Sequence, residues 1–425
     1  MKKENYRITI IGAGLSGLTA AYVLEQYGYH PTIIEATDTV GGRVQSTLGD
    51  GYIMDHGFQV LLTAYPMCQK YLDYEGLQLR EFQLGAAIFR NKKIEKIGDP
   101  LRAFQFAWPT LFSTIGSLRD KWKVFTLNQK VKKKTIDSIF SSPETTTLDY
   151  LLNYGFSHTI IENFFKPFFG GIFLEEELRT SSRMFEFIYK MFGEGYAALP
   201  ENGISEIALQ LRDMLQQTQF LFTTKVSEVR DGWLRTEDGR ELQNHMTIVA
   251  TEASSLVANL RNQRTSWKSC DTLYFEIEQL PYQEALVGLV PGAHTLSNTL
   301  CFSTQLQKNE GEKSLVSVTV VREHNLDNDT LVSRIKTELK DHCGLIVGKC
   351  IQRITIPQAL PELNNVQYGL SASETRLTTQ VFLAGDVLLN GSLNAAMMSG
   401  QRAAEGVIQA IEDGLVVGEL TSEFT

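Results

Sequence analysis

Residues 8–35, ITIIGAGLSGLTAAYVLEQYGYHPTIIE, are the stretch that most constrains how this chain folds. A short apolar run leads into the glycine-rich segment GAGLSG, a segment with helical periodicity follows, and a second apolar run ends in an acid. This order is the complete βαβ fingerprint of a dinucleotide-binding fold. A strand-turn-helix with coincidental glycines would not require both flanking strands and the terminal acid.

Each glycine of the fingerprint has its own physical role. Gly12 permits a sharp turn after the first strand, Gly14 lets the backbone approach a pyrophosphate, and Gly17 lets the helix pack closely against the strand. The pyrophosphate is expected at the free N–H groups of the first helical turn, which begins with Leu15 and Ser16. These five residues are therefore predicted to bind the cofactor.

An acid ends the second apolar run. Glu35 lies 18 residues after Gly17, close to the spacing at which a carboxylate accepts hydrogen bonds from the hydroxyls of an adenosine ribose. Its negative charge disfavours the 2′-phosphate of NADP. Ala36, the next residue, is assigned to the same site.

The composition is that of a soluble protein with two domains. At 425 residues the chain exceeds the size at which a single core keeps growing, and its hydrophobic content is 43%. The net charge of −9 argues against a nucleic-acid binder. The five cysteines are scattered and lack the spacing of metal ligands, so we expect reduced thiols, a cytoplasmic location and no metal site. The first strand begins too early for a signal peptide, and no apolar run is long enough to span a membrane.

A second glycine-rich segment begins six residues after Glu35. Gly41 and Gly42 allow another close approach of backbone to ligand, and Arg43 can pair with a phosphate. Together with the fingerprint, this segment resembles the FAD-dependent family that includes monoamine and polyamine oxidases, protoporphyrinogen oxidase and the phytoene desaturases. The resemblance implies that Glu35, Gly41, Gly42 and Arg43 belong to one FAD site.

The resemblance places the following segment, MDHGFQVLLTAYP, near the flavin ring. Its candidates beside the isoalloxazine are Asp55, His56, Gly57 and Phe58. His56 could act as a general base, because an imidazole exchanges its proton near neutral pH. We favour the alternative, a loop histidine hydrogen-bonded to the backbone. His56 and Phe58 are the only catalytic candidates that we name, because the flavin is expected to carry the chemistry.

Later segments return the chain to the cofactor. The resemblance implies that the backbone of Val226 contacts the adenine. It also implies that Gly385 and Asp386 contact the ribityl chain and the pyrophosphate. Asn394 and Ala395 open a helix whose positive end points at the flavin, where it stabilises the negative charge of the reduced ring. No cysteine lies near Asp386, so the FAD is expected to be non-covalent.

These matches predict an α/β fold, a doubly wound Rossmann-type FAD-binding domain with an inserted α+β substrate domain. We expect residues 1–60, 200–260 and 365–425 in the FAD-binding domain, and 61–199 and 261–364 in the substrate domain. The chain contains no second dinucleotide fingerprint. Oxygen, a quinone or another carrier is therefore the expected electron acceptor.

Two features indicate an apolar substrate. Residues 164–173, FFKPFFGGIF, are rich in phenylalanine and resemble the phytoene-desaturase branch, although such rings also fill cores. Many amine oxidases carry a lysine on the strand that we expect at 271–277, and no lysine stands between Thr272 and Leu280. We therefore expect an FAD-dependent oxidoreductase that desaturates or dehydrogenates an isoprenoid-, carotenoid- or tetrapyrrole-like molecule. Amine oxidation and a flavin-bound protein without turnover stay open as alternatives.

Residues 103–134 have an unusual charge pattern. Sixteen uncharged residues, 103–118, precede seven lysines and arginines and a single acid, Asp120. An aromatic apolar run beside a basic cluster can rest on an anionic membrane surface. The alternative is a core helix followed by a solvated basic helix. A peripheral membrane contact through this segment is therefore an open expectation.

Overall fold

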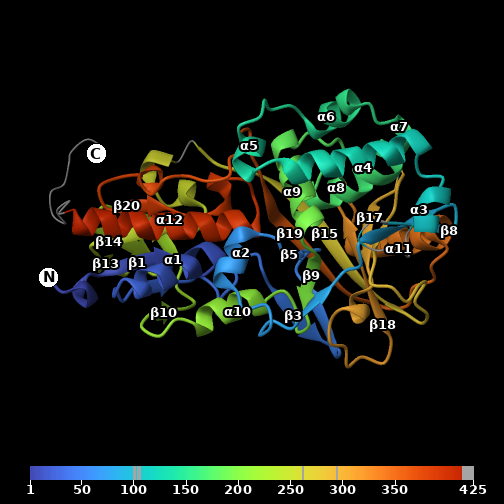
Figure 1. Cartoon of the computed structure of the whole chain (residues 1–425). Helices are drawn as coiled ribbons and strands as arrows, with labels where there is room; N and C mark the ends of the chain where they lie inside the picture. Colours follow the sequence, from blue (N-terminus) through green and yellow to red (C-terminus); the bar gives the residue numbers. More distant parts are fainter. Residues whose placement is uncertain (99–101, 103–106, 261–262, 293–294, 414–425) are drawn as a thin grey trace.

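A computed structural model of the chain describes residues 1–98, 102, 107–260, 263–292 and 295–413. Figure 1 shows two parts side by side, one built around a parallel sheet and one around a larger, mainly antiparallel sheet covered on one side by helices. This arrangement confirms the predicted α/β fold class. Residues 103–106, part of the uncharged run 103–118, and the C-terminal residues 414–425 lie outside the described residues.

The parallel sheet has five strands in the order β10-β2-β1-β14-β20, and each pairs in parallel with its neighbours. The strands are β1 (Ile8–Ile11), β2 (Thr32–Ile34), β10 (Gln219–Leu221), β14 (Met246–Val249) and β20 (Val381–Leu383). β1 and β14 are buried along their whole length, as expected for central strands covered on both faces. Because all five strands run in the same direction, the carboxyl ends of strands far apart in the sequence lie at one edge of the sheet.

Two helices, α1 (Leu15–Gln26) and α12 (Leu393–Glu412), pack closely beside this sheet (Figure 1). A Cβ at Gly400 would lie 2.1 Å from the Ser16 carbonyl oxygen, and a Cβ at Gly17 would lie 2.0 Å from the Gly12 carbonyl oxygen. Glycine at these positions lets α1 approach both its own strand and α12. The role predicted for Gly17 is thus a packing role.

The larger sheet has seven strands in the order β19-β15-β18-β17-β16-β7-β8, antiparallel except for the β16–β7 pair. Its strands are β7 (Gly85–Arg90), β8 (Lys93–Gly98), β15 (Ser266–Ile277), β16 (Val287–Leu289), β17 (Ser297–Cys301), β18 (Ser314–Val320) and β19 (Cys350–Glu362). The strand expected at 271–277 in fact begins at Ser266. Its first five residues are polar or aromatic and hide the alternation, but pairing with β19 extends the strand.

Most helices of the second part lie on one side of this sheet (Figure 1). They are α3 (Ala107–Phe112), α4 (Leu118–Lys133), α5 (Ile136–Phe140), α6 (Thr147–Tyr154), α7 (His158–Ile160), α8 (Lys166–Phe173) and α9 (Ser182–Glu194), and α11 (Asn328–Glu338) packs elsewhere. Phe165 and Phe169 are fully buried in the main core. For these two rings the core-filling alternative holds.

Smaller elements complete the fold. They are α2 (Pro66–Tyr71), α10 (Glu206–Asp213), the hairpin β3 (Ser46–Gly49) and β4 (Tyr52–Asp55), the sheet of β5 (Leu61–Leu62), β6 (Leu79–Glu81) and β9 (Ala197–Pro200), and the sheet of β11 (Val226–Arg230), β12 (Trp233–Thr236) and β13 (Glu241–Gln243). The exact domain boundaries stay a prediction.

None of the helices in the described ranges combines the length and apolar character that a membrane crossing requires.

Candidate functional site

A cavity of about 700 Å³ lies where the two parts of the molecule meet. Its walls come from the carboxyl ends of β1, β14 and β20, from the first turns of α1 and α12, and from α8, α9, β15 and β19. Ligands of open α/β sheets bind at the carboxyl ends of the strands. The volume lies within the range of known small-molecule sites.

The glycines at the nucleotide end of the cavity differ in what surrounds them. Gly12 has a φ of +102°, and a Cβ there would lie 2.9 Å from the Ala250 carbonyl oxygen. A Cβ at Gly14 would meet nothing within 4 Å. Gly41 donates its N–H to the Ala13 carbonyl oxygen at 2.9 Å, which joins the two glycine-rich loops. The space beside Gly14 is therefore open to a ligand.

Glu35 is held in place by the fingerprint loop. Its Oε2 accepts the N–H of Ala13 at 2.7 Å, and its Oε1 accepts the N–H and hydroxyl of Thr37 at 2.9 and 3.0 Å. A carboxylate oxygen has more than one acceptor position. Glu35 can therefore keep these bonds and still accept bonds from ribose hydroxyls, and that role stays a prediction.

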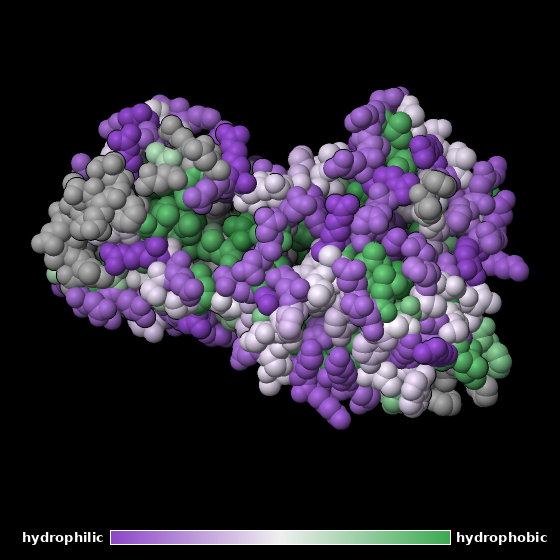
Figure 2. Space-filling model, turned by 90° about the horizontal axis from the view of Figure 1, so that it is seen from above, coloured by the Kyte–Doolittle hydropathy of each residue, from purple (hydrophilic) through white to green (hydrophobic). Residues whose placement is uncertain are grey.

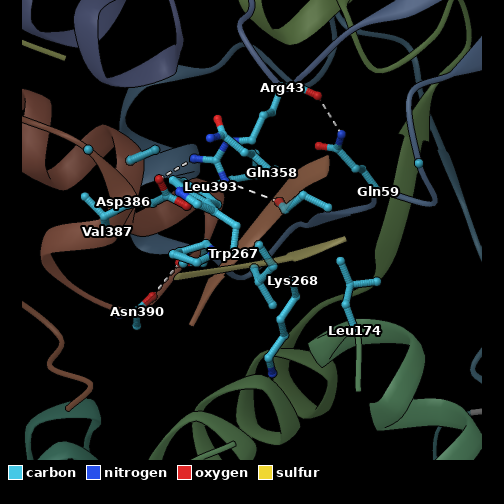
Figure 3. Close-up of a pocket in the computed structure, with 18 of the residues that line it drawn as sticks. Arg43, Gln59, Leu174, Trp267, Lys268, Gln358, Asp386, Val387, Asn390 and Leu393 are labelled. Atoms are coloured by element: carbon cyan, nitrogen blue, oxygen red, sulfur yellow. Dashed lines mark hydrogen bonds and ion pairs between the residues drawn. The ribbon is translucent and has the colours of Figure 1, made fainter. Parts of the chain in front are cut away.

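Arg43 and Asp386 form an ion pair in the cavity wall, although they are 343 positions apart in the chain. Figure 3 shows the two side chains directed toward one another. The Arg43 guanidinium also lies 5.1 Å from the ring centroid of Trp267 and donates to the Ala359 carbonyl oxygen at 3.3 Å. The ion pair connects the loop of residues 41–43 to the residues that follow β20. A pyrophosphate placed here would share Arg43 with Asp386.

Most of the predicted site residues line the cavity. They are Gly12, Gly14, Leu15, Ser16, Glu35, Gly41, Gly42, Arg43, His56, Gly57, Phe58, Gly385 and Asp386. The structure brings these residues together from five separate segments of the chain.

Six predicted residues are not in the cavity wall: Gly17, Ala36, Asp55, Val226, Asn394 and Ala395. Val226 is 5% exposed and packs in a small apolar core. Asn394 is fully buried, and its Oδ1 accepts the N–H of Met67 at 3.0 Å. Its neighbours Leu393 and Ala396 line the cavity instead. The first turn of α12 therefore contacts the cavity, but with Leu393 and Ala396 in place of Asn394 and Ala395.

His56 lines the cavity, and the structure corrects its expected hydrogen bond. The ring Nε2 pairs with the Thr47 hydroxyl at 2.8 Å, while the backbone N–H of His56 donates to Gln45. Burial lowers the pKa of His56 below its ordinary value of 6.5, and the neighbouring Asp55 carboxylate opposes this shift. The ring is therefore neutral near pH 7.

Asp55 lies beneath the cavity wall and has no cationic partner among the bonds of its carboxylate. Its oxygens accept from the Ser46 hydroxyl at 2.6 Å, the Ile204 N–H at 3.0 Å and the Gln307 amide at 2.6 Å. Burial raises the pKa of Asp55. These bonds join the end of β4 to three other segments, so Asp55 has a structural role.

Sequence reasoning missed Lys268. Because β15 begins at Ser266, this lysine lies on the strand and lines the cavity. Its Nζ donates to the Phe173 carbonyl oxygen at 2.9 Å, to Glu175 at 3.0 Å and to the Thr180 hydroxyl at 3.3 Å. The argument from a missing lysine is therefore wrong. A search that extended the strand toward its polar start would have found it.

The part of the cavity formed by residues 58–65, the end of α8 and α9 carries many apolar side chains. We call this the apolar wall: Phe58, Val60, Leu62, Tyr65, Ile172, Phe173, Leu174, Met184, Ile188 and Phe192. Figure 3 shows Leu174 near the helices, apart from Asp386 and Asn390. The cavity therefore combines a glycine-rich polar end with a largely apolar one.

Titratable side chains do not cluster as metal ligands in the described part of the chain, where no group of three His, Cys, Asp or Glu residues is placed to hold an ion.

Comparison with known proteins gives consistent matches. The family model described as flavin containing amine oxidoreductase matches residues 15–408. Protoporphyrinogen oxidase 2 of Arabidopsis thaliana is 29% identical over 165 residues, 39% of this chain and 32% of that protein. An L-amino-acid oxidase of Sistrurus catenatus edwardsii is 41% identical over 76 residues, 18% of this chain and 15% of that protein. The matched segments thus span a third or less of these curated relatives.

A solved structure extends the likeness to nearly the whole chain. An oxidoreductase from Methanosarcina mazei superimposes with a TM-score of 0.73 at 15% identity, covering 94% of this chain and 100% of that one. At this identity the match shows a shared fold.

Proposed function

The chain belongs to the flavin containing amine oxidoreductase family, and from that premise we propose that it is an FAD-dependent oxidoreductase whose substrate is an apolar small molecule. The reaction class is desaturation or dehydrogenation of an isoprenoid-, carotenoid- or tetrapyrrole-like framework. Bound FAD supplies the hydride acceptor. The protein supplies binding, orientation and the exclusion of water.

The glycine-rich end of the cavity fits a non-covalent FAD. The space beside Gly14 suits a pyrophosphate, because the backbone there can be approached closely and the first N–H groups of a helix have no partner within the helix. Glu35 is fixed where a ribose would lie, and Arg43 provides a positive charge. The fit supports these residues as the cofactor site.

The apolar wall is the observation that carries the proposal. Aromatic and aliphatic side chains from residues 58–65, α8 and α9 face one cavity with the nucleotide end. Such a wall binds a ligand by excluding water from apolar surface, at roughly 25 cal/mol per Å² of area buried. A hydrocarbon framework gains from this burial over its whole length, whereas a small charged amine would lose its hydration.

Two charged groups in this part of the cavity, Lys268 and Glu175, are already paired with each other. Lys268 gives its ammonium hydrogens to three protein oxygens, and Glu175 also accepts the N–H of Thr180 at 2.8 Å. His56 is neutral and bonded to Thr47. We therefore expect these side chains to shape the cavity and orient the substrate. We assign a proton transfer to none of them.

Oxygen, a quinone or another carrier reoxidises the flavin in this proposal. The absence of a second dinucleotide fingerprint from the sequence supports such an acceptor over a bound nicotinamide.

Anaerobic titration of the purified holoprotein tests the substrate class. The flavin absorbance is followed while a reduced tetrapyrrole, a polyunsaturated isoprenoid precursor, L-amino acids and a diamine are added in separate experiments. Bleaching by an apolar compound is the expected result. Bleaching by amines alone would overturn the proposal, and a flavin that no compound bleaches would favour a binding protein without turnover. A colourless protein that releases no FAD on denaturation would remove the cofactor assignment itself.

Amine oxidation is the second candidate, because Lys268 stands on β15 in the cavity wall. The sequence predicts no lysine on this strand, and that prediction was the argument against amine oxidation. Lys268→Met separates the two functions: a loss of bleaching by amines, with flavin retained, would support the second candidate.

A further inference from the structure

The corner between α3 and α4 exposes an unusual number of large apolar side chains. Of the ten large hydrophobic residues that are exposed in the described chain, five lie in the fifteen residues 111–125. They are Leu111 (46% exposed), Phe112 (74%), Leu118 (67%), Trp122 (65%) and Phe125 (37%). We call this surface the α3–α4 corner. Figure 2, which views the molecule from above relative to Figure 1, shows hydrophobic patches among hydrophilic residues on this half of the molecule.

The corner is held together by specific bonds. The Lys121 ammonium donates to the carbonyl oxygens of Leu111 at 2.7 Å and Ser113 at 2.9 Å, which ties the end of α3 to the start of α4. Ser117 caps α4, and the Trp122 and Phe125 ring centroids are 5.4 Å apart. Residues 118, 122 and 125 follow the spacing of one helix face. The exposed rings are thus presented by ordered backbone.

The charge around these rings has one sign. The single acid in residues 107–134, Asp120, is 2% exposed and bonded to Ser117 and Ser157. Arg119, Lys130 and Lys133 are exposed. The whole chain has a net charge of −9, so this basic surface is local and not a reflection of overall composition.

We propose that the α3–α4 corner docks on an anionic lipid bilayer. The apolar side chains would enter the boundary between headgroups and acyl chains, while the surrounding arginine and lysines contact lipid phosphates. Trp122 suits this depth because an indole ring has an apolar body and a polar N–H. A protein partner is disfavoured because the cores of protein interfaces are depleted in lysine.

The docked surface lies close to the candidate active cavity. α4 packs against α9 (Figure 1), and α9 gives Met184, Ile188 and Phe192 to the apolar wall. The α3–α4 corner is therefore one helix layer from the cavity. Delivery of an apolar substrate from the bilayer rests on the proposed function, whereas the docking itself does not.

Vesicle flotation with the full-length holoprotein tests the docking. Vesicles of phosphatidylcholine with about 30% phosphatidylglycerol are compared with vesicles of pure phosphatidylcholine. The protein is expected to float with the anionic vesicles and to be released in part by salt, because phosphate contacts are screened. Trp122 fluorescence should shift to the blue on binding, and W122F should remove that shift while it retains most of the binding.

Substitution of the corner gives the decisive comparison. Phe112→Ser with Trp122→Ser should weaken partitioning at least tenfold, and Arg119→Glu should weaken it by about fivefold or more. The matched control, Leu48→Ser with Ile346→Ser, removes two residues that are 76% and 78% exposed elsewhere on the surface and should leave binding unchanged.

Three outcomes would overturn the proposal. They are no flotation of the wild-type protein, equal loss of flotation in the control, and a change in oligomeric state, measured by sedimentation, when Phe112 and Trp122 are replaced. The last outcome would identify the corner as an interface between copies of this chain. Flavin bleaching by an apolar substrate in detergent is independent of all three, so failure of docking and failure of the proposed function are distinguishable.

Discussion

Replacing Gly14 by alanine separates cofactor binding from folding. Gly14 has φ −73° and ψ 177°, which alanine adopts without strain. An added Cβ would meet no protein atom within 4 Å. Losing glycine at the N-cap costs about 0.5–1 kcal/mol, and the lower entropy of the unfolded chain returns about 0.4–1 kcal/mol. The free energy of unfolding of the apoprotein should therefore change by less than about 1 kcal/mol.

FAD binding should respond differently, because the new methyl group would occupy the space that we assign to the pyrophosphate. We expect the dissociation constant to rise at least tenfold, which corresponds to about 1.4 kcal/mol. Urea unfolding of the apoprotein gives the stability, and quenching of flavin fluorescence on titration gives the dissociation constant. A dissociation constant within twofold of the wild-type value would refute the assignment of Gly14.

Gly17→Ala is the matched control. The added Cβ would lie 2.0 Å from the Gly12 carbonyl oxygen, which is backbone and has no room to move. Such overpacking costs about 1–3 kcal/mol or more. This variant should be destabilised even without FAD. An apoprotein as stable as the wild type would show that α1 does not need its close approach to β1.

Three further predictions concern individual side chains. Glu35→Ala should lower FAD retention on gel filtration about tenfold and cost the apoprotein about 1 kcal/mol for the lost Ala13 bond; unchanged retention would mean that the ribose assignment is wrong. Lys268→Met leaves Glu175, 13% exposed, without its cation and should cost about 3 kcal/mol in urea unfolding, while Lys268→Met with Glu175→Gln should recover part of this; a loss below about 1 kcal/mol would contradict the pairing. Because burial lowers the pKa of His56 from 6.5, the folded protein binds this proton less readily than the unfolded chain does, so stability should fall as pH drops below about 6.5. His56→Gln should reduce that fall between pH 7.5 and 5.5, and equal pH dependence in both proteins would count against it.

The positions and directions of some side chains depend on an environment that is assembled from distant segments of the chain. Lys268 was overlooked since the polar start of β15 becomes a strand only through pairing with β19. Asn394 was assigned to the flavin, yet the fold turns its side chain toward the backbone of Met67. Phe165 and Phe169 fill the core, while Phe173, from the same aromatic run, lines the cavity. In each case the direction of a side chain depends on which neighbour packs against it.

The sequence by itself determined the βαβ unit, the turn at Gly12, the close packing at Gly17 and the acid that follows β2. These features depend on backbone conformations and spacings within about thirty residues, which local residue types control. Only the tertiary structure decided that Arg43 meets Asp386 across 343 positions. It also decided that an apolar wall from α8 and α9 faces the nucleotide end of the same cavity. Such contacts arise from the packing of two sheets and their helices, and no local pattern records which side chains that packing brings together.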